Sequence, residues 1–174
     1  MPDELLTAFR FEVQLRWSAR VVLGSAAPQQ PSVAPGGSTG EALCDGGFQE
    51  VGGLEIEMDV SDIVEGGRNN AVYRRLGRGK FPPLVLKRGL LIGSNGQVDR
   101  RFWGWMQDAL DGVLPLRRVD GTVRVKSADD TVRATWTFER GLPVKLRGPE
   151  LNAKTGEVAI EELSIAHEGL RLAS

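Results

Sequence analysis

The residue types that most often perform catalysis are scarce in this sequence. Its 174 residues include one histidine, His167, and one cysteine, Cys44. A Ser-His-Asp arrangement would have to use His167, yet no Gly-x-Ser-x-Gly motif accompanies it. Cys44 lies in a segment of small and polar residues, without a basic partner that would activate its thiol. We therefore predict no catalytic residue, and we interpret His167 as a histidine at the end of a strand.

Ligands for a metal ion or a cofactor are equally sparse. One histidine and one cysteine do not support a soft-ligand metal site. Gly93 and Gly96 do not have the spacing of a phosphate-binding loop. Glu55, Glu57 and Asp59 lie on one strand face and could bind a hard cation or act as paired catalytic carboxylates, but a solvated or lumen-facing strand edge is favoured. We predict no metal and no cofactor.

Composition and charge narrow the class of protein further. The 22 basic and 23 acidic residues leave a net charge of −1, without the clustered basic excess of a nucleic-acid-binding protein. No apolar run approaches the length of a membrane span, and the N-terminus lacks the pattern of a signal peptide. The single cysteine suits synthesis in a reducing cytosol. We expect one domain over residues 1–174, with no specific nucleic-acid or lipid ligand.

Alternation of apolar and polar residues predicts strands along most of the chain. In Phe9–Trp17 every second residue is apolar, and Phe48–Val60 and Thr131–Arg140 show the same period. Shorter strand-like runs are Leu84–Ile92, Leu116–Val119, Thr122–Ser127 and Leu142–Leu146. The Asp120-Gly121 pair predicts a hairpin turn between two of these runs, and Asp129-Asp130 predicts another turn.

One helix is predicted, over Asp99–Asp111. Asp99 can cap it and Gly112 can end it, and its apolar residues recur at helical spacing: Phe102, Trp105, Met106, Ala109 and Leu110. Glu157–Leu172 is ambiguous, because the apolar phases of its two halves disagree across Glu161-Glu162. A strand with a bulge at that point and a helix are both open.

Two segments differ in composition from the strands. Residues 24–47 are rich in Pro, Gly, Ser and Ala and cannot bury enough apolar surface to offset their ordering entropy, so we expect a flexible loop insertion. Glu65–Lys80 is polar, basic and rich in glycine, which indicates an excursion from the body. About eight strands and one helix, without βαβ alternation, predict a mainly β fold: an antiparallel β-barrel or two-sheet sandwich with one flanking α-helix.

Several motifs resemble those of one protein family. They are GFQEVGGLE around Phe48–Leu54, EGGRN at Glu65–Asn69, LVLKRGL at Leu84–Leu90, the helix at Trp103–Asp108, PVKLRGPELNA at Pro143–Ala153 and EVAIEELSIAHEGL at Glu157–Leu170. In order and spacing they resemble the phage tail tube protein family of contractile tails. That family includes the inner-tube subunits of extracellular contractile injection systems and is related to the tube protein of type VI secretion.

The resemblance implies a structural, non-enzymatic β-barrel subunit. Such a subunit would form hexameric rings that stack into a hollow tube inside a contractile sheath. Its partners would be further copies of itself, the sheath protein and the baseplate and spike proteins, and the lumen could carry cargo. It would be made in the bacterial cytoplasm and become part of a phage tail or a tail-like particle that can be released.

The resemblance also suggests where subunits meet, since the basic excursion matches the region that in this family reaches between stacked rings. The candidates for inter-ring or inter-subunit contacts are Glu65, Arg68, Arg74, Arg75, Lys80, Glu161 and Glu162. We expect Arg68, Arg74 and Arg75 to pair with Glu161 or Glu162 of the next ring.

Two other functions stay open at this point. The segment Gly24–Gly46 departs from the family pattern, in which the connection is short. The chain could therefore be a baseplate-proximal tube initiator that forms a single adaptor ring. A small ligand-binding β-barrel is the alternative from another class, and it would need an apolar interior cavity and a monomeric state.

Overall fold

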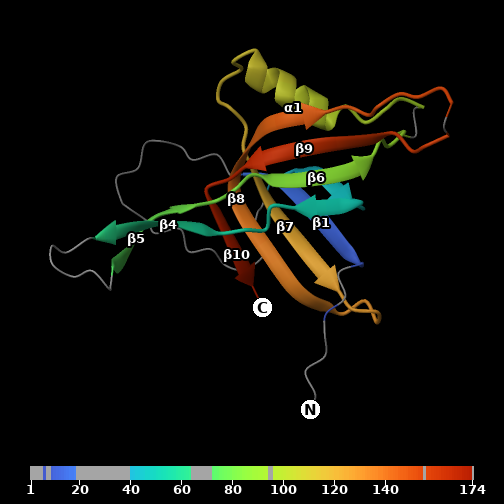
Figure 1. The fold of residues 1–174 in the computed structure, drawn as a ribbon. Helices are drawn as coiled ribbons and strands as arrows, with labels where there is room; N and C mark the ends of the chain where they lie inside the picture. The colour runs from blue at the N-terminus through green and yellow to red at the C-terminus, as the bar shows by residue number, and fades with distance from the viewer. Residues whose placement is uncertain are drawn as a thin grey trace.

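The computed structural model describes residues 6, 9–18, 40–63, 72–93, 96–154 and 156–173. In this part of the chain, strands dominate and one helix is present (Figure 1). The elements are β1 (Phe11–Trp17), β2 (Ala42–Gly46), β3 (Glu50–Gly52), β4 (Glu57–Ile63), β5 (Tyr73–Lys80), β6 (Leu84–Gly89), α1 (Arg101–Leu110), β7 (Val119–Lys126), β8 (Val132–Arg147), β9 (Ile160–Ala166) and β10 (Gly169–Ala173). The mainly β fold with one helix is confirmed.

Eight strands form one bent sheet with the order β2-β1-β7-β8-β9-β6-β3, and β10 also pairs with β8. Each of these pairings is antiparallel. The two ends of this path, β2 and β3, are joined directly by residues 47–49, so the chain itself connects the ends of the curved sheet. The described ladders do not close into a full cylinder, but the arrangement is compatible with the predicted barrel.

Strand β8 connects the two halves of this sheet. Its first part pairs with β7 and β10, and from Leu142 onward it pairs with β9 (Figure 1). Arg140 stands at the change of partner with a φ of 56°, and its backbone N–H donates to Asp120 Oδ1 at 2.9 Å. The sequence predicted two separate strands, Thr131–Arg140 and Leu142–Leu146. They are one strand, because this bend lets the backbone change sheets without leaving the ladder.

The predicted hairpin at Asp120-Gly121 is wrong, since β7 continues through both residues, with a shift of its register against β8 at this point. Glycine is required there by packing: a Cβ added to Gly121 would lie 2.1 Å from the ring of Phe138. Asp120 accepts a hydrogen bond from Ser18 Oγ at 2.6 Å. The chain reverses later, beside Asp130 with its φ of 62°, so the turn predicted at Asp129-Asp130 is confirmed.

The core lies between the strands and the inner face of α1. Alternation in β1 is confirmed, since Val13 and Leu15 are fully buried and Gln14 between them is not. The strand begins at Phe11, so the predicted start at Phe9 is wrong, and Phe9 is 65% exposed. The other strands and the helix add large apolar side chains to the same cluster: Leu84, Leu86, Phe102, Trp105, Val119, Val123, Phe138, Leu163 and Ile165. Each large side chain buried in this way contributes about 1.5–3 kcal/mol to folding.

Helix α1 forms within the predicted span. Asp99 Oδ1 accepts a hydrogen bond from the backbone N–H of Arg101 at 3.0 Å, which satisfies a free donor at the start of the helix. Gly112 follows the helix with a φ of 68°, a conformation that favours glycine. The indole Nε1 of Trp105 donates to the carbonyl of Arg117 at 2.9 Å, so the helix is also attached to the segment that follows it.

The expected loop over residues 24–47 is wrong in its last part. Ala42–Gly46 forms β2 and pairs with β1, because Leu43 and Cys44 supply two buried side chains in a segment otherwise composed of small residues. Residues 24–39 lie outside the described part of the chain.

The C-terminal segment forms two strands, β9 and β10, and the helical alternative is wrong. The pairing of β9 with β6 is continuous from Ile160 to Ile165, so its ladder has no bulge at Glu161-Glu162. The phases seemed to disagree because Glu161 occupies an inward position, where it is 1% exposed, in line with Leu163 and Ile165. Glu161 is thus a buried carboxylate, whereas its residue type alone predicts a surface position.

Candidate assembly interface

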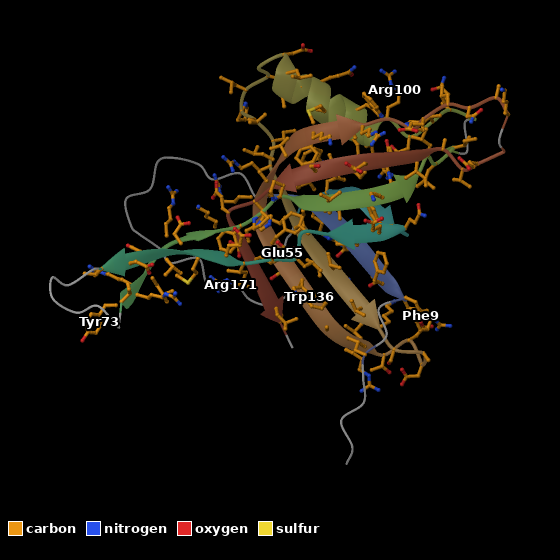
Figure 2. The ribbon with its side chains drawn as sticks, viewed as in Figure 1. Phe9, Glu55, Tyr73, Arg100, Trp136 and Arg171 are labelled. Atoms are coloured by element: carbon orange, nitrogen blue, oxygen red, sulfur yellow. The ribbon has the colours of Figure 1, made fainter. Side chains whose placement is uncertain are left out.

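A two-stranded arm formed by β4 and β5 extends away from the bent sheet (Figure 1). Every residue of both strands is exposed. The ladder pairs Glu57 with Lys80 at the root and Ile63 with Tyr73 farther out. Figure 2 shows Tyr73 on the arm, well away from Trp136 in the main sheet. The predicted excursion is therefore confirmed over its second strand, Tyr73–Lys80.

The arm carries apolar side chains on both of its faces. Val60 lies opposite Leu76, and these residues are 56% and 66% exposed. Ile63 lies opposite Tyr73, and these residues are 47% and 51% exposed. Because the two pairs are three positions apart in a regular ladder, they point to opposite faces. A two-stranded ribbon alone is marginally stable in water, and these apolar side chains have no core of their own in the described subunit.

Charged residues along the arm pair with one another across the ladder. Arg74 lies 3.5 Å from Asp62, and Lys80 lies 2.6 Å from Asp59. Arg75 lies opposite Ser61, which carries no charge. Exposed pairs of this kind add little to stability. Arg75 therefore has no opposite charge across the ladder, unlike Arg74 and Lys80.

The other predicted contact residues are distributed differently. Glu65 and Arg68 lie outside the described residues. Glu162, in β9, lies 3.7 Å from Lys145 and keeps 22% of its side chain exposed. Glu161 is buried and bonded inside the subunit, so its carboxylate is not on a surface that another ring could reach. Within one subunit, the structure does not bring the arm and these carboxylates together.

Sequence reasoning missed a buried cluster centred on Arg88, whose other members are Cys44, Asp99, Phe102 and Glu161. Arg88 is 1% exposed, and its Nε donates to Glu161 Oε1 at 2.6 Å. The interpretation of Cys44 as a loop residue without a basic neighbour is wrong, because Arg88 donates to its Sγ at 3.1 Å. The only sequence signal was a Lys-Arg pair inside the apolar run Leu84–Leu90.

Electrostatics in this cluster do not activate a nucleophile. Burial raises the pKa of the Cys44 thiol, and the nearby Arg88 charge only partly opposes this effect. Side-chain hydrogen bonds from Arg101 lower the pKa of Asp99 to about 2. Among the described residues, no group of three or more His, Cys, Asp and Glu side chains is arranged to hold a metal ion.

His167 lies at the root of the arm, between β9 and β10, and is 8% exposed. Its ring packs between those of Phe81 and Phe138, with centroids 5.6 Å away in each case. Nδ1 lies 3.1 Å from the carbonyl oxygen of Gly169. Burial lowers the pKa of His167, which keeps the ring neutral. The surroundings are those of a packed histidine at a strand end, as the sequence indicated.

The main sheet has open edges. In the described ladders β10 pairs with β8 alone, β2 with β1 alone and β3 with β6 alone. An open edge presents unpaired backbone groups to which another strand can add.

The helix found in the described ranges falls short of the length and apolar character that a membrane crossing requires.

Comparison with known proteins gives a consistent picture of the fold. A chain of the anti-feeding prophage baseplate superimposes with a TM-score of 0.72 at 20% identity, covering 98% of this chain and 97% of that one. A chain of the sheath–tube complex of an extracellular contractile injection system, PVC, gives 0.72 at 16% identity, covering 99% and 94%. A chain of the sheath/tube terminator of PVC gives 0.70 at 16% identity, with both chains covered completely (100% and 100%).

The comparison with curated protein sequences gave no match. The profile of one family, by contrast, spans almost the whole chain. Residues 7–171 match the family of the T4-like virus tail tube protein gp19. The matched span includes the arm, the buried Arg88 cluster and all the strands of the bent sheet except the last residues of β10. Members of this family are structural proteins and not enzymes. The chain belongs to the T4-like tail tube protein family.

Proposed function

We propose that this protein is the inner-tube subunit of a contractile injection particle or phage tail, and that it assembles into stacked hexameric rings inside a sheath. Family membership supports a tube protein, and the similar solved structures come from contractile particles. The ring number, the stacking, and the sheath and baseplate as partners are part of the proposal. Synthesis in the cytoplasm, followed by incorporation into the particle, belongs to it as well.

The β4–β5 arm is the observation that carries this proposal. Its apolar side chains lie on both faces and have no core of their own. A monomer would leave Val60 and Leu76 in water, whereas stacked copies can cover both faces. The partner that fits is another copy of the same chain, because a repeating assembly supplies one identical surface for every arm.

The open edges of the sheet support the lateral contacts of a ring. Edge-to-edge pairing between neighbouring copies would satisfy backbone groups of β2, β3 or β10 that the subunit alone leaves unpaired. Closure into a ring removes these edges for every subunit at once. This accounts for a sheet that bends strongly without closing within one chain.

Electron microscopy of the purified protein tests the proposal. Tubes of stacked rings are expected at high concentration, and compact monomers alone would contradict it. The double variant Val60→Asp/Leu76→Asp should abolish tubes, because it places charge on an apolar face of the arm. The control is Val158→Asp, at a position that is 75% exposed but lies outside the arm. If the control abolished tubes as completely, the arm would have no special role.

A second function within the same machine is favoured by the comparisons themselves. The chain from a baseplate superimposes as well as the chain from a sheath–tube complex, with a TM-score of 0.72 for each. A baseplate-proximal initiator would form one adaptor ring and no polymer. The same microscopy separates the two functions, because isolated rings at every concentration would favour the initiator.

A further inference from the structure

Arg88 contacts residues from several separate elements at once. Its Nε donates to Glu161 Oε1 in β9 at 2.6 Å, and its Nη1 donates to Cys44 Sγ in β2 at 3.1 Å. Nη2 lies 3.2 Å from Asp99 Oδ2, just before α1. The guanidinium carbon lies 3.8 Å from the centre of the Phe102 ring, in α1. Nε and Nη1 therefore donate hydrogen bonds, Nη2 lies at ion-pair distance from Asp99 without a hydrogen bond, and one face of the plane lies over the Phe102 ring.

This arrangement does not serve stability well. Arg88 and Glu161 are each 1% exposed, and removing two charges from water costs nearly as much as their attraction returns. A planar guanidinium instead fixes the relative orientation of its partners, because its donors point in fixed directions and its face stacks on an aromatic ring. A cluster of this kind defines geometry where an apolar core would not.

Unlike the strands, α1 has no ladder of backbone hydrogen bonds that ties it to the sheet. The helix buries two side chains, Phe102 and Trp105, and apolar contacts of this kind are non-directional. Its C-terminal part is attached through the bond from Trp105 Nε1 to the carbonyl of Arg117. Its N-terminal part is attached through Arg88, which reaches both Asp99 and Phe102.

We propose that Arg88 is a positioning residue that fixes the N-terminal part of α1 on the sheet. The position of the helix has a consequence at its other end, where the chain carries exposed apolar residues. Leu110 is 78% exposed, Val113 50% and Leu114 83%. A shift of α1 displaces this surface relative to the sheet. The inference concerns the isolated subunit and does not depend on the tube proposal.

The chain contains its own probe of this cluster. Cys44 is the single cysteine of the sequence, is 1% exposed and touches Arg88. A thiol reagent such as DTNB reports each opening of the cluster by labelling Cys44. Hydrogen exchange measured by mass spectrometry reports the opening of α1, with the amides of β7 as an internal reference for global unfolding.

The decisive variant is Arg88→Lys, which keeps the positive charge but loses the planar donor geometry. Its control is Arg101→Lys, because Arg101 donates to the same Asp99 at 2.9 and 2.8 Å from a half-exposed position. In Arg88→Lys we expect two rates to rise about tenfold more than the hydrogen-exchange rate of β7 does. They are the hydrogen-exchange rate of α1 and the labelling rate of Cys44, each normalised to the rate in the unfolded protein. Loss of one charge-assisted hydrogen bond gives an effect of this size. In Arg101→Lys the expected rise is under about twofold.

Two results would overturn the proposal. One is that α1 and Cys44 in Arg88→Lys accelerate no more than β7, and the other is that the control behaves identically. If Arg88→Lys does not fold, Glu161→Gln decides, because it keeps the shape and an acceptor while removing one charge. We then expect hydrogen exchange at α1 and labelling of Cys44 to accelerate at least about threefold, with exchange at β7 unchanged. The same degree of acceleration at α1, Cys44 and β7 would refute the inference.

Discussion

Arg88 and Glu161 form an ion pair with an N–O distance of 2.6 Å between two side chains that are each 1% exposed, 73 positions apart in the sequence. The pair links neighbouring strands, since Arg88 lies directly opposite Glu161 in the β6–β9 ladder. Both side chains point into the subunit, beside the apolar residues of the same strands. The fold thus places two opposite charges in positions where alternation alone would place apolar residues.

Breaking this pair from one side should destabilise the protein strongly. Arg88→Met leaves the Glu161 carboxylate buried without its cation, which costs about 3–5 kcal/mol. Urea unfolding followed by tryptophan fluorescence measures this loss. In the double variant Arg88→Met/Glu161→Leu we expect stability within about 1 kcal/mol of the original, because both desolvated charges are gone and Asp99 keeps its bonds to Arg101. A double variant as unstable as the single one would contradict this account.

Gly121 and Gly104 should respond to alanine in opposite directions. At Gly121 an added Cβ meets the Phe138 ring at 2.1 Å, so Gly121→Ala should destabilise the protein by about 1–3 kcal/mol through overpacking. At Gly104, in the middle of α1, nothing lies within 4 Å of an added Cβ. Gly104→Ala should therefore stabilise the protein by about 0.5–1 kcal/mol. Thermal unfolding of the two variants side by side checks the signs, and a stable Gly121→Ala protein would refute the packing argument.

The elements that could be predicted from sequence are those whose signal is local. Alternation found β1, and helical spacing found α1, because each pattern reports burial of one face over consecutive residues. Composition indicated the excursion whose last part is β5, and the resemblance supplied the family. In the proposed tube, the ring number and the lumen-facing residues would depend on contacts with other copies of the chain, which leave no local pattern in the sequence.

The errors have a common physical cause, which is contact between residues far apart in sequence. Asp-Gly suggested a turn at Asp120-Gly121, but the glycine is there to admit Phe138. Glu161 looked like a surface carboxylate because its cation lies on another strand. Cys44 looked like a loop residue because pairing with β1 is what makes its short segment a strand. The apolar faces of the arm are also invisible until the ladder sets Val60 opposite Leu76.

His167 should make the free energy of unfolding fall as the pH drops below about 6.5. Burial lowers its folded-state pKa below 6.5, so the unfolded state binds more protons in this range. Its contribution is therefore present above the unfolded pKa and is lost as the pH falls toward the folded one, by at most about 1.4 kcal/mol per pH unit for a single proton. Urea unfolding at several pH values should show that the free energy of unfolding declines less steeply with falling pH in His167→Gln than in the original protein. Parallel declines in the two proteins would show that His167 contributes nothing.

Reversing the charge of Arg75 should weaken assembly more than it weakens folding. Arg75 is exposed and lies opposite the neutral Ser61, so it has charge to offer another molecule, whereas Arg74 already faces Asp62 at 3.5 Å. In the proposed tube each copy would present Arg75 to a carboxylate of the next ring, and our candidate is Glu162, whose side chain is 22% exposed. We expect Arg75→Glu to lose roughly 1 kcal/mol of association free energy per subunit. This loss raises the critical concentration for polymerisation about fivefold.

Sedimentation of the polymer measures this concentration. Lys154→Glu, the same reversal outside the arm, is the matched control and should polymerise normally. Adding salt should weaken the original protein and narrow its difference from Arg75→Glu, because exposed ion pairs are screened. If Arg75→Glu and Arg74→Glu both polymerise at the original concentration, the arm binds its neighbours through its apolar faces alone and the charge pairing between rings is wrong.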